Sequence, residues 1–398
     1  MHTTVSIDIA IFGGGIAGLW LLNRLRQTGF SAMLFEFNTL GGGQTGHSQG
    51  IIHGGMKYAL TGKLTQDAEA MAAMPMRWQQ SLAGLGECDL SRVPILSNKQ
   101  YMWSPRASKA KLMQFLANST LQAHVEPLTK ESYPSVFQHP DFKGHVFAIN
   151  ETVLDVPVLI RELANANQNT LFKIEDLSEK DIELNEIGHI TSMTLHAGCQ
   201  KINLSAQRYI FTAGTGNEIA INRLNTKALA MQRRPLHMVM VKLPFHAPLY
   251  AHCLNFSARP RLTVTTHYRQ DGSMVWYLGG LLAEEGVQRN KTNQIAATKQ
   301  ELNLLFPWLD FSTARFETIR IDRAEPLQAD GLKPITCFTK TIGNTIIAWP
   351  TKLALAPKLT DDIMQQLQLT HLTPCQPHKE ALAAWPHPSC AIPPWEIF

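Results

Sequence analysis

Hydrophobic positions near the N-terminus fall into two short runs separated by a glycine cluster and a segment with helical patterning. The first run ends at Phe12 and leads directly into Gly13, and the second covers residues 31–35 and ends at Glu36. The order strand, glycine turn, helix and strand, with an acidic residue about twenty positions after the glycines, is typical of a dinucleotide-binding βαβ unit. The pattern therefore predicts a nucleotide site in which Glu36 accepts hydrogen bonds from a ribose.

Three glycines of this unit have separate tasks. Gly13 permits the tight turn, Gly15 lets the backbone approach a pyrophosphate, and Gly18 lets the helix pack closely on the strand. The helix that starts at Ile16 and Ala17 offers N–H donors and a favourable dipole to the phosphates. The motif alone does not separate FAD from NAD.

The remaining hydrophobic pattern alternates between helical faces and strand-like runs. It predicts helices over residues 65–85, 108–117, 155–166, 292–305 and 354–369, the first of them kinked or broken at Pro75. It predicts strands over residues 94–103, 171–174, 190–195, 209–216, 238–241, 262–264, 275–280 and 346–350. From residue 373 the tail has no regular period, and we expect it to lie over the surface as a strap.

Composition bounds the class of protein. The chain has 398 residues, of which 44% are hydrophobic and 17% charged, as in a globular protein large enough for two domains. No apolar run is long enough to cross a bilayer, and the N-terminus lacks the basic region of a signal peptide, so we expect a cytoplasmic protein. The six cysteines contain no CxxC pair, which argues against a zinc site, a dithiol redox centre and a disulfide framework.

Charge is distributed unevenly along the chain. The net charge of +4 is too small to indicate nucleic acid as a partner. Between residues 216 and 270, however, eight lysines and arginines face a single acidic residue, Glu218. This stretch is either a solvated basic face or the binding surface for an anionic substrate or partner.

A long loop follows Glu36. Residues 41–58 combine glycines with small hydroxyl side chains, which suits a loop that wraps a cofactor. The loop contains the sequence Ile-His-Gly-Gly at His53, followed by Lys57 and Tyr58. This segment resembles one in FAD-linked glycerol-3-phosphate dehydrogenases and is related to one in L-2-hydroxyglutarate dehydrogenases. Over residues 6–369 the chain resembles the D-amino-acid oxidase superfamily of FAD-dependent oxidoreductases.

Shorter matches extend the resemblance toward the C-terminus. The pair Lys352-Leu353 stands where the glycerol-phosphate enzymes have a Gly-Gly-Lys-Leu-Thr turn into the last helix. His237 resembles a substrate-side histidine that opens a strand. Arg323 approximates the arginine of an Arg-Pro-Leu motif, and Arg320 is the alternative.

The chain also departs from those enzymes. Lys57 replaces an arginine, which would lose bidentate recognition of phosphate, and Pro350-Thr351 replaces the glycine pair before Lys352. No segment matches their C-terminal cap domain. These departures leave the substrate open.

The resemblance implies an α/β fold, with a Rossmann-like FAD-binding domain and an inserted substrate domain built on an antiparallel sheet. The implied FAD-binding domain is discontinuous. It comprises residues 1–90, 150–218 and 320–372, the substrate domain comprises residues 91–149 and 219–319, and residues 373–398 form the tail.

FAD is the cofactor that the resemblance implies. The single nucleotide fingerprint and the lack of paired cysteines indicate that the substrate itself reduces the flavin, whose N5 accepts a hydride while a base takes the proton. His53 and His237 are the candidate bases, and His53 alternatively orients the flavin. The expected cofactor contacts come from the glycine motif, the loop and three later segments: Gly13, Gly15, Ile16, Ala17, Gly18, Glu36, Gln44, Thr45, Ser48, Gly50, Leu177, Ala213, Gly214 and Leu353.

Charged side chains complete the expected site. Lys352 and the start of the last helix would stabilise negative charge on the reduced flavin, and Lys57, Tyr58 and Arg323 would hold an anionic group of the substrate. We therefore expect oxidation of a small anionic hydroxy compound, either similar to glycerol-3-phosphate or a 2-hydroxy acid, with oxygen, a quinone or another electron acceptor. The alternatives are an amine or amino-acid oxidase on the same fold, and an RNA-linked or non-catalytic flavoprotein.

Overall fold

The computed structural model describes residues 3–54, 66–105, 125–225, 229–254, 259–328, 336–368 and 379–398, together with Pro334, Leu372 and Pro374. The predicted helix over residues 108–117 lies outside these ranges, as do Lys57 and Tyr58.

The first sheet contains the N-terminal βαβ unit. Its strand order is β17 (Phe338–Ile342), β18 (Thr345–Trp349), β11 (Gln200–Phe211), β1 (Thr3–Phe12), β2 (Ala32–Glu36) and β8 (Leu171–Lys173). The pairs from β18 to β8 are parallel, and β17 is an antiparallel edge strand. Two further strands, β10 (Ile190–Ala197) and β9 (Ile182–Leu184), pair antiparallel beside β11. The predicted Rossmann-like architecture is therefore confirmed.

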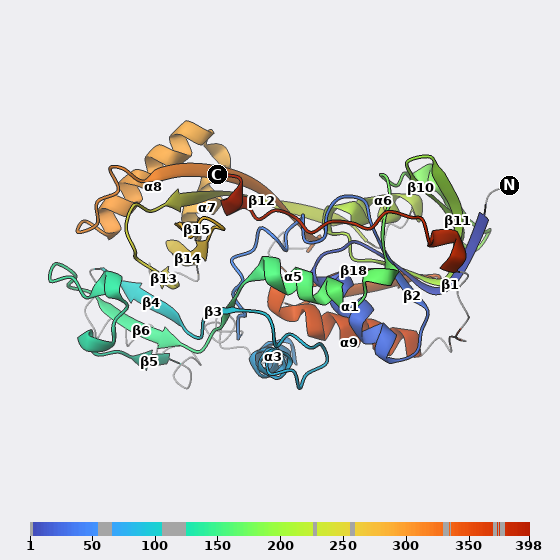
Figure 1. Cartoon of the computed structure of the whole chain (residues 1–398), viewed down its shortest axis with the longest axis horizontal. Coiled ribbons are helices and arrows are strands. Elements are labelled where there is room, and N and C mark those ends of the chain that lie inside the picture. Colours follow the sequence, from blue (N-terminus) through green and yellow to red (C-terminus); the bar gives the residue numbers. More distant parts are fainter. Residues whose placement is uncertain are drawn as a thin grey trace.

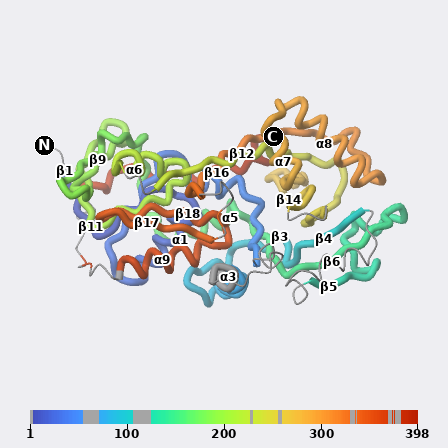
Figure 2. The backbone as a smooth tube through the Cα atoms, turned by 180° about the vertical axis from the view of Figure 1, so that it is seen from behind, coloured from blue at the N-terminus to red at the C-terminus, as the bar shows by residue number. Residues whose placement is uncertain are grey.

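Helices cover this first sheet (Figures 1 and 2). One apolar cluster joins its strands to α1 (Ile16–Gln27), α3 (Gln66–Leu82), α5 (Val156–Asn165) and α9 (Ala356–Gln368). A second cluster, on the other face, includes α6 (Asn217–Arg223) and two side chains of the tail, Leu382 and Trp385. The helix α3 continues through Pro75, so it is not broken there, and a kink at Pro75 stays a prediction.

The second sheet has the order β16 (Arg315–Pro326), β12 (Met231–Lys242), β15 (Met274–Gly279), β14 (Leu262–Tyr268), β13 (Ala251–Cys253), β4 (Gln100–Ser104), β6 (His145–Ile149) and β5 (Val125–Pro127). All pairs are antiparallel except β13 with β4, so the expected antiparallel sheet contains one parallel pair. The single strand predicted over residues 94–103 is two strands. β3 (Ile95–Ser97) pairs with β7 (Val153–Leu154), whereas β4 joins the second sheet.

The two faces of the second sheet have different neighbours. The helix α8 (Lys291–Leu305), with the short α7 (Leu281–Glu285), lies over one face, where Val239, Val241 and Trp276 join the apolar cluster. We call this the helical face. On the opposite face, which we call the inner face, Met238 and Tyr277 pack with Trp395 of the tail. The long strands β12 and β16 run from one half of the molecule toward the other (Figures 1 and 2).

The tail forms a strap between the two sheets, as Figure 1 shows by its red trace. Cys390 makes a parallel bridge with Leu40, next to the glycine-rich loop. Farther on, the ring of Trp395 stacks on His267 of β14, with the two ring centroids 3.8 Å apart. His267 is almost fully buried, and a ring nitrogen lies 3.1 Å from the Thr265 hydroxyl. Burial lowers the pKa of His267 to about 3.

Candidate active site

The glycine turn between β1 and α1 leaves no room for side chains. Gly13 has φ of +106°, and a Cβ atom there would lie 2.6 Å from the Cα atom of Ala213. A Cβ atom on Gly18 would lie 2.0 Å from the carbonyl oxygen of Gly13. Both contacts are far inside van der Waals distance, because the turn crosses the end of β11 and α1 packs directly on it.

The start of α1 is held by two side chains. The Thr45 hydroxyl accepts a hydrogen bond of 3.1 Å from the Ile16 amide. A Cβ atom on Gly15 would lie 3.1 Å from the same hydroxyl oxygen. Glu36 accepts hydrogen bonds from the amides of Gly14, at 2.6 Å, and Asn38, at 2.7 Å. Burial raises the pKa of the Glu36 carboxyl, although these two amides oppose the effect. Glu36 therefore shapes the glycine turn, in addition to any contact with a ribose.

The glycine-rich loop reaches both sheets. The Gln44 side chain accepts a hydrogen bond of 3.0 Å from the amide of Ala324 on β16. On the inner face of the second sheet, the Gln49 amide group donates a hydrogen bond of 2.9 Å to the carbonyl oxygen of Tyr277. The buried Ser48 hydroxyl has no hydrogen-bond partner within the described ranges. A buried hydroxyl without a partner is costly, so this atom fits a polar group of a bound cofactor.

The end of β11 faces the same loop. The Ala213 amide donates to Asn217, and Gly214, with φ of +60°, accepts a hydrogen bond of 3.2 Å from the indole of Trp349. Gly50 also has positive φ, at +72°, and a Cβ atom there would lie 2.4 Å from the Leu154 carbonyl oxygen. These close backbone contacts and the unpartnered Ser48 hydroxyl lie at the carboxyl edge of the first sheet. Such an arrangement fits a dinucleotide such as FAD.

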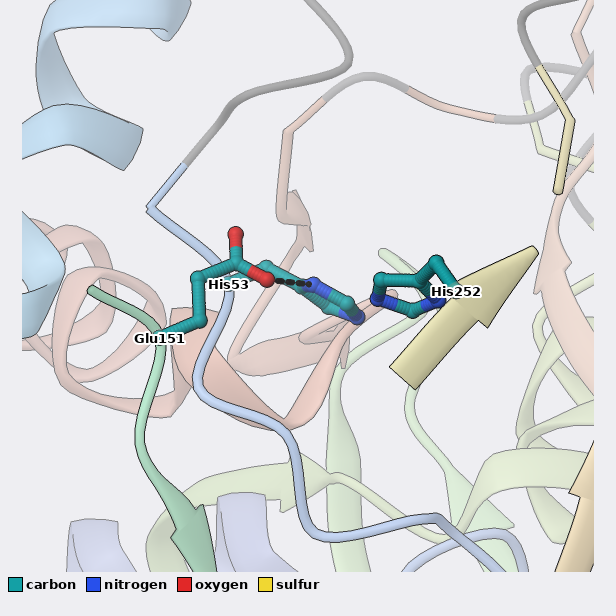
Figure 3. Close-up of side chains that lie close together, drawn as sticks. All are labelled: His53, Glu151 and His252. Carbon is teal, nitrogen blue, oxygen red and sulfur yellow. Dashed lines mark hydrogen bonds and ion pairs between the residues drawn. The ribbon is translucent and has the colours of Figure 1, made fainter. Parts of the chain in front are cut away.

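His53 lies in the later part of this loop and faces two side chains that were not predicted from the sequence (Figure 3). Its Nδ1 lies 3.0 Å from Glu151 Oε2, and Glu151 Oε1 accepts a hydrogen bond of 3.0 Å from the Gly54 amide. Glu151 is buried and follows β6. Burial by itself raises the pKa of Glu151, but His53, His252 and the Gly54 amide together bring it below its usual range.

His252 of β13 lies on the other side of His53. The two ring centroids are 6.3 Å apart, and Nδ1 of His252 lies 2.9 Å from the Thr263 hydroxyl. One ring nitrogen of each histidine and one oxygen of Glu151 lie within 4.8 Å of one another, a set that could also hold a metal ion. Neither Glu151 nor His252 belongs to a motif in the sequence, so only the folded chain brings them to His53.

His237 lies elsewhere. It is buried on the helical face of the second sheet, and its Nδ1 is 2.9 Å from the Gly286 carbonyl oxygen. The structure therefore does not bring the two predicted bases together. His237 fits a packing role between β12 and the segment that follows α7.

Arg323 and its alternative Arg320 lie on opposite faces of β16. Arg320 donates to the carbonyl oxygens of Val287 and Arg289, at 3.0 and 2.7 Å, and so fixes the turn before α8. Arg323 is half-buried, and its Nε donates to the Arg234 carbonyl oxygen at 3.0 Å. Burial, followed by the charge of Arg234, lowers the pKa of Arg323 to about 10. No carboxylate within the described ranges forms an ion pair with Arg323, so its charge is available for an anion.

The remaining predicted residues lie near the first sheet. Lys352 and Leu353 stand at the turn into α9, as the motif predicts, and the preceding Thr351 adopts φ of +58°, a conformation that favours glycine. Leu177 packs partly buried against the cluster beneath β8. None of the helices in the described part of the chain combines the length and apolar character needed to span a membrane.

Comparisons with known proteins agree with this architecture. Residues 8–326 match the family described as FAD dependent oxidoreductase. The protein belongs to this family. It is 44% identical, over its whole length and 99% of the relative, to a probable FAD-dependent oxidoreductase of Pseudomonas aeruginosa. Family and relative together show that the chain is an FAD-dependent oxidoreductase.

Solved structures extend the comparison. A crystal structure of an FAD-dependent oxidoreductase from P. aeruginosa superposes with a TM-score of 0.85 at 41% identity, covering 100% of this chain and 99% of that one. An FAD-bound L-α-glycerophosphate oxidase from Mycoplasma pneumoniae has a TM-score of 0.66 at 14% identity, covering 91% and 95% of the two chains. Glycine oxidase from Geobacillus kaustophilus has a TM-score of 0.65 at 15% identity, covering 94% and 97%. The last two share the fold.

Proposed function

We propose that this flavoprotein oxidises a small anionic hydroxy compound. The observation that carries the proposal is His53, which lies in the glycine-rich loop and is held by the buried Glu151 beside the inner face of the second sheet. A histidine held by a carboxylate is a common arrangement for accepting a proton. When bound, FAD supplies an acceptor for the hydride that leaves the carbon.

The chain's own residues would bind the substrate and move its proton. His53 accepts the proton of the hydroxyl group as the carbon loses its hydride, so that the product is a carbonyl compound. Arg323 offers a half-buried cation without a carboxylate partner among the described residues, and such a group favours a carboxylate or phosphate of the substrate. Lys352 and the start of α9 support negative charge near the cofactor.

Anaerobic mixing of the purified, FAD-loaded enzyme with candidate substrates tests the proposal. The panel contains 2-hydroxy acids, polyol phosphates and amino acids, and bleaching of the flavin absorption reports reduction. We expect bleaching by at least one hydroxy compound and recovery of the colour when the acceptor is added, with oxygen and a quinone tested separately. Bleaching by amino acids alone would replace this proposal with an amino-acid oxidase, since an arginine binds either carboxylate.

The arginine gives a second, independent readout. Arg323→Gln should raise the KM of the anionic substrate more than tenfold, because a charge-assisted hydrogen bond is lost, while the rate at saturating substrate changes less. The same substitution should not affect reduction by a neutral alcohol. An equal effect on charged and neutral substrates would refute anion binding by Arg323.

A further inference from the structure

We propose that Glu151 is a positioning residue that fixes the tautomer of His53, and that His252 is a second imidazole facing the same substrate oxygen. This assignment rests on the proposed oxidation of a hydroxy compound and identifies the side chains that surround the reacting oxygen. Glu151 lies just after β6, His53 lies in the glycine-rich loop and His252 lies on β13, so the three side chains come from segments that are distant in sequence (Figure 3).

The contacts of Glu151 determine which nitrogen of His53 carries a proton. The carboxylate accepts from the Gly54 amide with one oxygen and meets Nδ1 of His53 with the other, at 3.0 Å in each case. A carboxylate is an acceptor, so Nδ1 must be the donor, and Nε2 of the neutral ring is left with a lone pair. Figure 3 shows the His53 ring between Glu151 and His252, so the far side of the ring faces His252. Nε2 is therefore the atom that accepts a proton.

The space between the two histidines suits one oxygen atom. A ring nitrogen of each lies within 4.8 Å of the other. Consider an oxygen that lies at an ordinary hydrogen-bond distance of about 2.8 Å from both nitrogens. The N–O–N angle at this oxygen is then at most about 120°, close to the geometry that a hydroxyl prefers. The Thr263 hydroxyl lies 2.9 Å from Nδ1 of His252 and orients the second ring, although a hydroxyl can donate or accept and so does not select its tautomer.

A buried glutamine on the same face gives an independent indication of a ligand. Met102 of β4 pairs with His252 of β13, and Gln100 shares the face of Met102 because it is two residues away. Gln100 is fully buried, and neither atom of its amide group has a hydrogen-bond partner among the residues described. Since buried amides are normally satisfied, a polar ligand beside His252 explains this side chain better than packing does.

A metal ion is the competing occupant of these three side chains. The hydrogen bond between Glu151 and His53 competes with it, since a metal held by both Glu151 and Nδ1 of His53 would replace the proton between them. Two imidazoles alone make a weak site, because zinc sites in proteins have three or four protein ligands. We therefore assign the cluster to proton transfer.

The test uses the FAD-loaded Glu151→Gln variant, whose neutral amide keeps the shape of the side chain. We expect the rate of flavin reduction at saturating substrate to fall about 10²–10⁴-fold, the range for loss of a positioned acid or base. Substrate affinity should change less than threefold. The exposed pair of His139 and Asp141, 3.7 Å apart, provides the matched control, and Asp141→Asn should leave the rate unchanged. His252→Gln should lower the rate at least tenfold.

A second readout does not depend on turnover. Nitrogen-15 NMR of histidine-labelled holoenzyme should show His53 protonated at Nδ1 in the wild type and a mixture of tautomers in Glu151→Gln. An unchanged tautomer together with an unchanged rate would overturn the assignment of Glu151. If no hydroxy compound reduces the wild-type flavin, the proposed function fails, whereas the tautomer measurement still judges the role of Glu151.

Zinc titration separates proton transfer from metal binding. We expect the wild-type holoenzyme to take up no stoichiometric zinc in isothermal calorimetry at micromolar concentration. Stoichiometric binding that disappears in His252→Gln would assign the cluster to a metal ion and overturn the proposal.

Discussion

The buried His267 predicts that acid destabilises the protein by a defined amount. Burial lowers the pKa of this imidazole to about 3, whereas a histidine in the unfolded chain titrates near 6.5. Between these values the unfolded state binds a proton that the folded state does not. The free energy of unfolding therefore decreases as the pH falls below about 6.5 and stops decreasing near pH 3.

The size of the effect follows from these two pKa values. Integrating the proton uptake of one group from pH 7 to pH 5 gives a loss of about 2 kcal/mol in the free energy of unfolding. His267→Gln removes this group and keeps a polar side chain next to Thr265. The variant is itself less stable, because the stacking on Trp395 is lost, but its stability should depend less on pH.

The assay is unfolding by guanidinium in saturating FAD, followed by tryptophan fluorescence. It measures the free energy of unfolding at pH 7 and at pH 5. The loss between the two pH values should be about 2 kcal/mol smaller in His267→Gln than in the wild type. The exposed His139→Gln is the control and should keep the wild-type dependence. Equal losses in His267→Gln and the wild type would show that His267 is protonated in the folded protein, and the reasoning from burial would be wrong.

Three further predictions concern packing, helix capping and the strap. Gly18→Ala should abolish FAD retention on gel filtration, since the added Cβ would lie 2.0 Å from the Gly13 carbonyl oxygen. Gly43→Ala should retain FAD, because a Cβ atom there would have no other atom within 4 Å. Asp155→Ala removes the cap that accepts from the Val158 amide at 3.1 Å and should lower the free energy of unfolding by about 1 kcal/mol; no loss would refute the cap. Trp395→Ala should cost about 3–5 kcal/mol in the same denaturation assay because the ring is buried against His267 and Tyr277; a cost below 1 kcal/mol would mean that the strap is not packed.

The parts of the fold predicted from sequence are those that depend on local chemistry. The βαβ unit is encoded within residues 3–36, where apolar runs, glycines and the terminal Glu36 all agree. The helix over residues 155–166 was predicted because its apolar residues share one face, and in the structure Asp155 caps it. Such signals are contained in a few neighbouring residues.

The candidate active site was predicted only in part, because its members meet through strand pairing between distant segments. His53 lies in a recognisable loop, but Glu151 and His252 stand in no motif and meet His53 only when β6 and β13 enter the same sheet. The position of His237, away from His53, was not predicted for a different reason. Residues 238–241 of β12 are all apolar, so alternation does not reveal which face the preceding histidine occupies.

The order of strands in the first sheet has a consequence for synthesis on the ribosome. β1 pairs with β11, and β11 in turn pairs with β18, whose residues are made about 130 positions later than the end of β11. Until β18 and α9 emerge, the nascent chain exposes the edge of β11 at residues 209–211 and the apolar side of α1 that α9 will cover. The growing polypeptide therefore passes through a long interval in which it is prone to aggregation, and slower, cooler expression with ample chaperone should raise the yield of native enzyme.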